Sequence, residues 1–223
     1  MEKLAGVILM AGSSTRFGGP KNKQFCLLNG KPVFTYSIET FAKHKSISEL
    51  TIVVNDENKQ NVQEFVEKND INAKLVIGGA TRQESVDHAL AALNLDDNDV
   101  IIIHDAARPL VDAFIINQVA KAAIEVGAAT AYIEATDTIA IQNGNDEVKS
   151  FASRESVAQI QTPQAFKFGL LKLAHQRAQN NIATDDCSLI LMLGRTVKLV
   201  KGDKKFHKIT TQEDIKYLEG LLK

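Results

Sequence analysis

The sequence predicts an α/β fold, in which a doubly wound, mostly parallel sheet carries a protruding β-arm. The short apolar runs of the chain lack the alternation of a strand with one wet face, so they are typical of parallel strands buried on both faces. Stretches of helical period separate most of these runs, which indicates right-handed crossovers between strands. With 223 residues, 44% of them hydrophobic, we expect one domain over residues 1–223 with a sizeable core.

Apolar runs and helical periods assign the individual elements. Strands are predicted over residues 5–10, 50–54, 74–77, 100–103, 128–133 and 196–200. Helices are predicted over 33–43, 81–93 and 215–222, and a further helix is lined by Ile115, Val119, Ala122 and Ile124. Thr81 with Glu84 predicts a capping box at the start of the second helix, and Thr211 with Asp214 is expected to cap the last one.

The segment from 137 to 164 does not follow this alternation. It is polar and β-prone, and Asn143-Gly144 between apolar pairs is a hairpin signal. We therefore expect a β-hairpin arm over 137–151. Its apolar residues have no obvious place to pack within one domain, so a dimer interface is expected; the alternative is an arm folded back on its own sheet.

Composition excludes several classes of protein. The 26 basic and 27 acidic residues give a net charge of -1, which provides no reason to expect nucleic-acid binding. Cys26 and Cys187 are too few for a disulfide scaffold and have no zinc-ligand spacing. No apolar run could span a membrane and no signal peptide is evident, so we expect a cytoplasmic protein.

A basic, small-residue loop over residues 10–24 follows the first predicted strand. Ligands of open α/β sheets bind at the carboxyl ends of strands, where small residues let backbone N–H groups approach phosphate oxygens and cations supply the countercharge. Neither G-x-x-x-x-G-K-S/T nor G-x-G-x-x-G is present, which disfavours P-loop hydrolases and dinucleotide dehydrogenases. The loop is a candidate phosphate site, or else a solvated basic loop.

A second motif, His104-Asp105-Ala106-Ala107-Arg108-Pro109, follows the strand over 100–103. A carboxylate at this end of a strand, near a phosphate loop, is well placed to hold Mg²⁺. Equally, Asp105 could pair with Arg108 to close a turn. His104 could be no more than a buried, hydrogen-bonded histidine.

Three weaker signals follow along the chain. Residues 78–85 form a Gly-rich turn from strand to helix, suited to reading a small ligand with backbone groups. Arg154 lies at the arm, and Gln161-Thr162-Pro163-Gln164 comes shortly after it. Lys208-Ile209-Thr210 follows a basic run over 201–205, which by default is a solvated surface.

Taken together, these motifs form an ordered set that extends from Ala11 to Thr210. In chain order they are A-G-x-x-x-R, K-Q, G-G-x-x-R-x-x-S, H-D-A-A-R-P, D-T, R, T-P-Q, T-D and K-I-T. It resembles the 2-C-methyl-D-erythritol 4-phosphate cytidylyltransferase family, which has a Rossmann-like nucleotidyltransferase fold. Ribitol-5-phosphate cytidylyltransferases share most of this framework, but Ala106-Ala107 favours the methylerythritol family. A sugar-1-phosphate nucleotidyltransferase and a non-catalytic nucleotide-binding protein are more distant alternatives.

The resemblance implies transfer of CMP from CTP to a polyol phosphate, with release of pyrophosphate, in a homodimer with shared active sites. It implies catalytic roles for Arg16, Lys23, Arg154 and Lys208, and Asp105 as the protein ligand of Mg²⁺ that arrives with CTP. The implied substrate-binding residues are Ala11, Gly12, Ala80, Arg82, Ser85, Asp105, Ala106, Arg108, Thr138, Thr162 and Thr184.

The chain departs from the family pattern at two of these positions. Either Lys21 or Lys23 could be the catalytic lysine of the first loop, and we choose Lys23 because Gln24-Phe25 follows it. Phe206-His207 replaces the usual lead-in to Lys208, which leaves Lys208 in place while the sequence does not define its local support.

Overall fold

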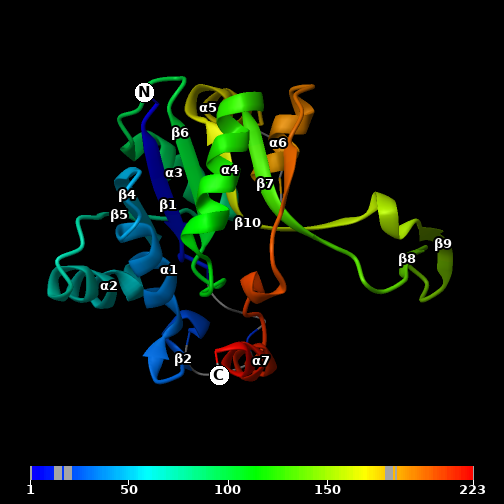
Figure 1. The fold of residues 1–223 in the computed structure, drawn as a ribbon, viewed down its shortest axis with the longest axis horizontal. Helices are drawn as coiled ribbons and strands as arrows, with labels where there is room; N and C mark the ends of the chain where they lie inside the picture. Colours follow the sequence, from blue (N-terminus) through cyan, green and yellow to red (C-terminus); the bar gives the residue numbers. More distant parts are fainter. Residues whose placement is uncertain (1, 13–16, 18–21, 179–182, 184, 223) are drawn as a thin grey trace.

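A central sheet dominates the computed structural model, which describes residues 2–12, 17, 22–178, 183 and 185–222 (Figure 1). Among these residues, seven strands pair in the order β11-β7-β10-β6-β1-β4-β5. The strands are β1 (Leu4–Leu9), β4 (Ile47–Val54), β5 (Lys74–Ile77), β6 (Val100–Asp105), β7 (Ala128–Glu134), β10 (Ala158–Lys167) and β11 (Lys198–Lys201). Only β10 runs antiparallel to its neighbours in this sheet, so the predicted doubly wound, mostly parallel α/β architecture is confirmed.

Helices cover both faces of the sheet. On one face, apolar residues of α1 (Val33–Ala42), α2 (Asp56–Lys68) and α4 (Ala113–Val126) form one core cluster with the strands. On the other face, α3 (Arg82–Ala92), α5 (Phe168–Arg177) and α6 (Asp186–Met192) form a second cluster. Three layers with two cores result, as expected when the strands are buried on both sides.

The predicted strands and helices are present, with shifted ends. The capping boxes at Thr81 and Thr211 are both formed, the latter at the start of α7 (Gln212–Leu221). Among the longer elements, helices α2, α5 and α6 were not predicted, nor was strand β10, which lies between β6 and β7 in the middle of the sheet. In α4, Ala122 and Ile124 are only partly buried, whereas Ile116, Ala120 and Ala123 are buried in the first core cluster.

The arm is a separate two-stranded sheet that projects from the body of the molecule (Figure 1). It consists of β8 (Ile139–Gln142) and β9 (Val148–Ala152), paired antiparallel, and the 3-10 helix η3 (Arg154–Ser156) follows β9. Ile141, Val148 and Phe151 are exposed on it, between 47% and 67%. The predicted hairpin is confirmed, and it does not fold back on its own sheet.

A small lobe lies beyond the strand ends and holds two predicted site segments together. Its short pair of strands, β2 (Leu27–Leu28) and β3 (Lys31–Pro32), follows the 3-10 helix η2 (Lys23–Phe25). Buried Leu28 and Val33 of this lobe pack with Ile209 and with Leu218 of α7. The segment carrying Lys23 and the segment carrying Lys208 therefore belong to one packed unit.

Candidate active site

The site is built where β1 and β6 end side by side. Leu9 pairs with Asp105 in the parallel register, so the segments that follow the two strands start from neighbouring positions. Ala106 N–H donates to the carbonyl of Leu9 over 3.0 Å, which ties these segments together. The carboxyl ends of parallel strands thus place Asp105 beside the start of the first loop, as the sequence predicted.

The Gly-rich turn after β5 closes the site from the neighbouring side. A Cβ atom added at Gly78 would lie 2.5 Å from the Cβ of Ala11, so only glycine allows this approach. Ser85 is buried in the first turns of α3, where its Oγ accepts a hydrogen bond from Gly79 N–H and donates to the carbonyl of Thr81. The hydroxyl of Ser85 therefore shapes the turn itself.

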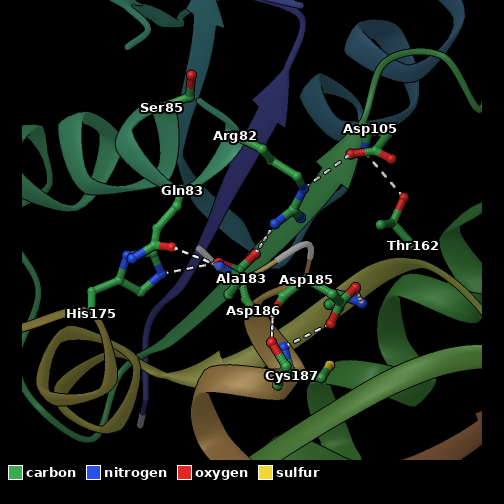
Figure 2. Close-up of polar contacts among 12 residues, drawn as sticks. Arg82, Gln83, Ser85, Asp105, Thr162, His175, Ala183, Asp185, Asp186 and Cys187 are labelled. Atoms are coloured by element: carbon green, nitrogen blue, oxygen red, sulfur yellow. Dashed lines mark hydrogen bonds and ion pairs between the residues drawn. The ribbon is translucent and has the colours of Figure 1, made fainter. Parts of the chain in front are cut away.

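Asp105 is the electrostatic centre of the described site. Its Oδ2 accepts a hydrogen bond from Nζ of Lys208 at 2.7 Å. Its Oδ1 lies 3.8 Å from Nε of Arg82, as Figure 2 shows. Burial acts to raise the pKa of Asp105, but Lys208, Arg82 and Arg108 outweigh it and hold the pKa well below its ordinary value. Asp105 is therefore ionised under all ordinary conditions and anchors two cations.

Behind Arg82 lies a second buried carboxylate that the sequence analysis did not identify. Asp186 Oδ2 accepts a hydrogen bond from Nη1 of Arg82 at 2.5 Å, and its Oδ1 lies 2.9 Å from Nε2 of His175. Gln83 also reaches this region, where its Oε1 accepts from the backbone N–H of Ala183 (Figure 2). The T-D motif at Thr184 marked this region in the sequence analysis. Nothing in the local sequence indicated that the next residue, Asp186, faces Arg82.

His104 forms a fixed support behind Asp105. Its Nε2 lies 3.0 Å from the carbonyl of Arg108, which can only accept, so Nε2 carries the proton in the neutral ring. Its Nδ1, 3.0 Å from Oγ1 of Thr162, then accepts from that hydroxyl, while Thr162 Oγ1 accepts from Asp105 N–H. The interpretation of His104 as a buried, hydrogen-bonded histidine is confirmed, and Thr162 fixes the Asp105 backbone.

Arg108 does not pair with Asp105, which corrects the alternative of an Asp–Arg turn. Its guanidinium donates to the carbonyl of Phe206 over 2.8 Å and to that of Ile160 over 3.5 Å. The backbone N–H of Arg108 does close a turn on the carbonyl of Asp105. The side chain thus connects the H-D-A-A-R-P motif to the segment before Lys208.

Lys208 is held from both sides by this connection. Phe206 is buried and accepts from Arg108, while Ile209 N–H donates to the carbonyl of Ala107 over 2.8 Å. His207 pairs with Asp214 of α7 at 2.6 Å. These contacts are the local support of Lys208, and they use the residues that depart from the family pattern.

The remaining predicted residues differ in their exposure and in the elements that carry them. Ala80, Gly12 and Thr138 are exposed, whereas Ala106 is fully buried in the core. Lys23 is half-buried in η2. Arg154 lies at the arm in η3, where its Nη1 is 3.4 Å from the carbonyl of Thr136. Arg16, Lys21 and Thr184 lie outside the described residues.

Asp105 is the candidate metal ligand of the described site, because the other carboxylate, Asp186, is engaged by Arg82 and His175. Among the described residues, no group of three or more His, Cys, Asp or Glu side chains could hold a metal ion. Asp105 alone suits Mg²⁺, which commonly takes one or two carboxylates together with substrate phosphate oxygens and waters. The residues therefore fit an ion that a triphosphate would bring with it.

The arrangement suits the handling of a phosphorylated ligand. Cations anchored on Asp105 border loops with small residues, and in-line phosphoryl or nucleotidyl transfer needs little more than such positioned charge.

In the part of the chain that the structure describes, no helix is long and apolar enough to cross a membrane.

Comparison with known proteins agrees with this chemistry. A family model described as 2-C-methyl-D-erythritol 4-phosphate cytidylyltransferase matches residues 4–223. Relatives of that name from Clostridium tetani and Desulforamulus reducens are 34% and 36% identical to the chain; the alignments cover all of this chain and 92% and 97% of theirs.

Solved structures show the same likeness. The 4-diphosphocytidyl-2C-methyl-D-erythritol synthase of Anaerococcus prevotii superposes with a TM-score of 0.88 at 27% identity, over 99% of this chain and 96% of that one. The 2-C-methyl-D-erythritol 4-phosphate cytidylyltransferase of Thermus thermophilus gives 0.80 at 29% identity, over 99% and 98%.

Proposed function

Because the chain belongs to the 2-C-methyl-D-erythritol 4-phosphate cytidylyltransferase family, we propose that its site transfers CMP from CTP to that polyol phosphate. The products are CDP-methylerythritol and pyrophosphate, and the reaction belongs to isoprenoid precursor synthesis by the non-mevalonate pathway. The observation that carries the proposal is the pairing of Arg82 and Lys208 with Asp105, beside the loops that the family motifs occupy.

In this reaction a phosphate oxygen of the acceptor attacks the α-phosphorus of CTP. One phosphorus–oxygen bond forms while the bond to the β-phosphate oxygen breaks, and the leaving group is pyrophosphate. Arg16 and Lys23 would neutralise charge on the five-coordinate phosphorus, and Arg154 and Lys208 would orient the acceptor phosphate. Positioning and charge stabilisation thus supply the catalysis.

The nucleotide would lie between the first loop and the Gly-rich turn. Ala11 and Gly12 border it on one side, and Ala80, Arg82 and Ser85 border it on the other, since Gly78 brings these two segments into contact. Thr138, Thr162 and Thr184 are secondary candidates on the acceptor side. Mg²⁺ bound to the triphosphate and to Asp105 would neutralise phosphate charge.

We further propose a homodimer whose arms complete the sites of the partner subunit. The arm carries η3, with Arg154, away from the strand ends of its own chain (Figure 1). Its exposed apolar residues, Ile141, Val148 and Phe151, suit a self-complementary interface. Both proposed substrates are highly charged and would not cross a membrane unaided, which supports a cytoplasmic location.

The acceptor assay tests the proposed function. Purified protein with CTP and Mg²⁺ is offered methylerythritol phosphate or ribitol 5-phosphate, and pyrophosphate release is measured. Faster turnover of ribitol 5-phosphate would show that the protein acts as a ribitol-5-phosphate cytidylyltransferase. Binding of CTP without turnover of either acceptor would instead support a non-catalytic nucleotide-binding protein.

Subunit mixing tests the shared site. Arg16→Ala and Arg154→Ala should each be nearly inactive alone. If Arg154 acts in the partner's site, random exchange of equal amounts restores about a quarter of the wild-type sites, because half the dimers are mixed and each has one intact site. If Arg154 acts in its own chain, verified exchange restores no activity.

A further inference from the structure

We propose that His175 is a positioning residue for the nucleotide side of the site: through Asp186 it fixes Arg82, and through Arg82 it supports the geometry around Asp105. Figure 2 shows these side chains in a row from α5 through the start of α6 to the end of β6. The effect on CMP transfer rests on the proposed function, whereas the positioning itself is a property of the protein without substrate.

His175 is almost entirely buried between two carboxylates. Its Nε2 lies 2.9 Å from Oδ1 of Asp186, and its Nδ1 lies 2.7 Å from Oδ1 of Asp87 on α3. Burial acts to lower the pKa of His175, but the hydrogen bond to Asp186 and the charges of Asp186 and Asp87 outweigh it and raise the pKa. On its own helix, Lys172 lies one turn before it. The ring therefore hydrogen-bonds to Asp186 through Nε2, while Nδ1 lies beside the Asp87 carboxylate at ion-pair distance without hydrogen-bond geometry.

Asp186 divides its two oxygens between two partners. Oδ1 faces His175 and Oδ2 faces Arg82, and the residue is 1% exposed. A carboxylate that is held at only one oxygen can turn about its terminal bond, whereas a donor at the second oxygen fixes that turn. The contact with His175 therefore determines where Oδ2 lies, and with it the acceptor available to Arg82.

The guanidinium of Arg82 depends on that acceptor. Its contact with Asp186 is 2.5 Å, while Asp105 is 3.8 Å away, so Asp186 is the tighter partner. Nη2 of Arg82 is buried and has no hydrogen-bond partner among the described residues, so it adds no further restraint. If Asp186 turns away, Arg82 shifts toward Asp105, where it competes with Lys208 for the carboxylate.

A purely structural role for His175 is the alternative. An apolar side chain could fill the same place in the second core, and exchanging a buried charged network for apolar residues is often neutral or stabilising. Stability alone thus does not explain a buried imidazole aligned on a carboxylate that holds a site arginine.

Two uncharged variants separate the two roles. The amide nitrogen of Gln reaches about as far as Nε2 of histidine, whereas that of Asn matches Nδ1. His175→Gln therefore keeps a donor to Asp186, whereas the shorter side chain of His175→Asn places its amide beside Asp87 and loses the donor to Asp186. His44→Asn, at a buried histidine at the end of α1, controls for the loss of any buried imidazole.

CTP binding is measured by calorimetry, and the KM for CTP, the KM for the acceptor and kcat are measured separately. His175→Asn should weaken CTP binding about tenfold, whereas His175→Gln and His44→Asn should stay within about threefold of wild type. Equal CTP binding by the two His175 variants, at melting temperatures that show folded protein, would overturn the proposal.

A measurement on the protein without substrate tests the positioning role of His175 independently of the proposed function. In the NMR spectrum of the free protein, the Nε–H signal of Arg82 should be sharp in wild type and His175→Gln and broadened by exchange in His175→Asn. An unchanged signal in all three proteins refutes the positioning role, even if CMP transfer is confirmed. The expected pattern in a protein that turns over no acceptor supports the positioning and refutes only the function.

Discussion

The stability of the protein should fall as the pH is lowered from 7 to 5, because of His104. The ring is fully buried, and it donates from Nε2 to Arg108 while Nδ1 accepts from Thr162. Protonation would put a second N–H against an oxygen that already accepts from Asp105 N–H. Burial lowers the pKa of His104 to about 4, although the hydrogen bond to Arg108 acts in the opposite direction.

The sign and the magnitude follow from linkage. In the unfolded chain a histidine titrates near 6.5, so between pH 6.5 and 4 the unfolded state binds a proton that the folded state rejects. Each pH unit in that window costs about 1.4 kcal/mol, and the full window costs roughly 3 kcal/mol. From pH 7 to pH 5 the free energy of unfolding should drop by about 2 kcal/mol on this account.

Urea unfolding of metal-free and nucleotide-free protein at several pH values measures this drop. His104→Gln, whose amide can still donate to the Arg108 carbonyl, is the matched variant because it does not titrate. Its stability should be lower at pH 7, but it should lose about 2 kcal/mol less than wild type by pH 5. The other histidines are common to both proteins and cancel. Parallel pH profiles for the two proteins would refute the assignment of a buried neutral ring.

Three further predictions concern the site and the arm. Gly78→Ala should weaken CTP binding at least tenfold in calorimetry, because its Cβ would lie 2.5 Å from Ala11 Cβ; unchanged affinity would show that the two loops move apart freely. Lys23→Ala should lower kcat by several orders of magnitude while CTP binding changes little, and a mild effect beside a crippling Lys21→Ala would move the catalytic role to Lys21. Phe151→Asp should shift sedimentation toward monomer and reduce activity with it, and an intact dimer would place the interface elsewhere.

The sheet could be predicted largely because its strands are continuous apolar runs, but β10 shows the limit of that signal. Gln161, Thr162 and Gln164 are buried in this central strand, and their amide N–H and hydroxyl groups hydrogen-bond to distant partners, while the side-chain oxygens of the two glutamines have none among the described residues. Gln164 donates to Thr130 on β7 and to Asp185 before α6. A polar run of this kind is typical of an exposed segment unless the partners are known.

Helix α2 was missed for a related reason. It packs on the sheet through Val62 and Val66, while most of its other residues are exposed. Three apolar positions in thirteen residues, Val62, Phe65 and Val66, give a weak helical period, although Asn55 does cap the helix through its side chain. Tertiary contact with an already formed sheet, rather than the local pattern, stabilises this helix.

Some residues of the candidate site could be predicted from local sequence motifs, and others could not. Asp105 and Lys208 could be proposed because each lies in a short motif with a recognisable place in the fold. Asp186 and His175 could not, because Asp186 meets Arg82 across 104 positions of the chain and its partner His175 lies on another helix. Contacts between side chains of different crossovers are fixed by packing, which local spacing does not encode.

These long-range contacts give the site its particular character. Two cations of the proposed site are already paired in the described structure: Lys208 with Asp105, and Arg82 with Asp105 and Asp186. Long flexible side chains lose about 2 kcal/mol of rotational freedom when they are fixed, and here part of that cost is met on folding rather than on binding. Because Asp105 also lies on a backbone clamped by Thr162 and His104, the charges that face the substrate need little rearrangement when it arrives, and a site of preorganised charge is what nucleotidyl transfer requires.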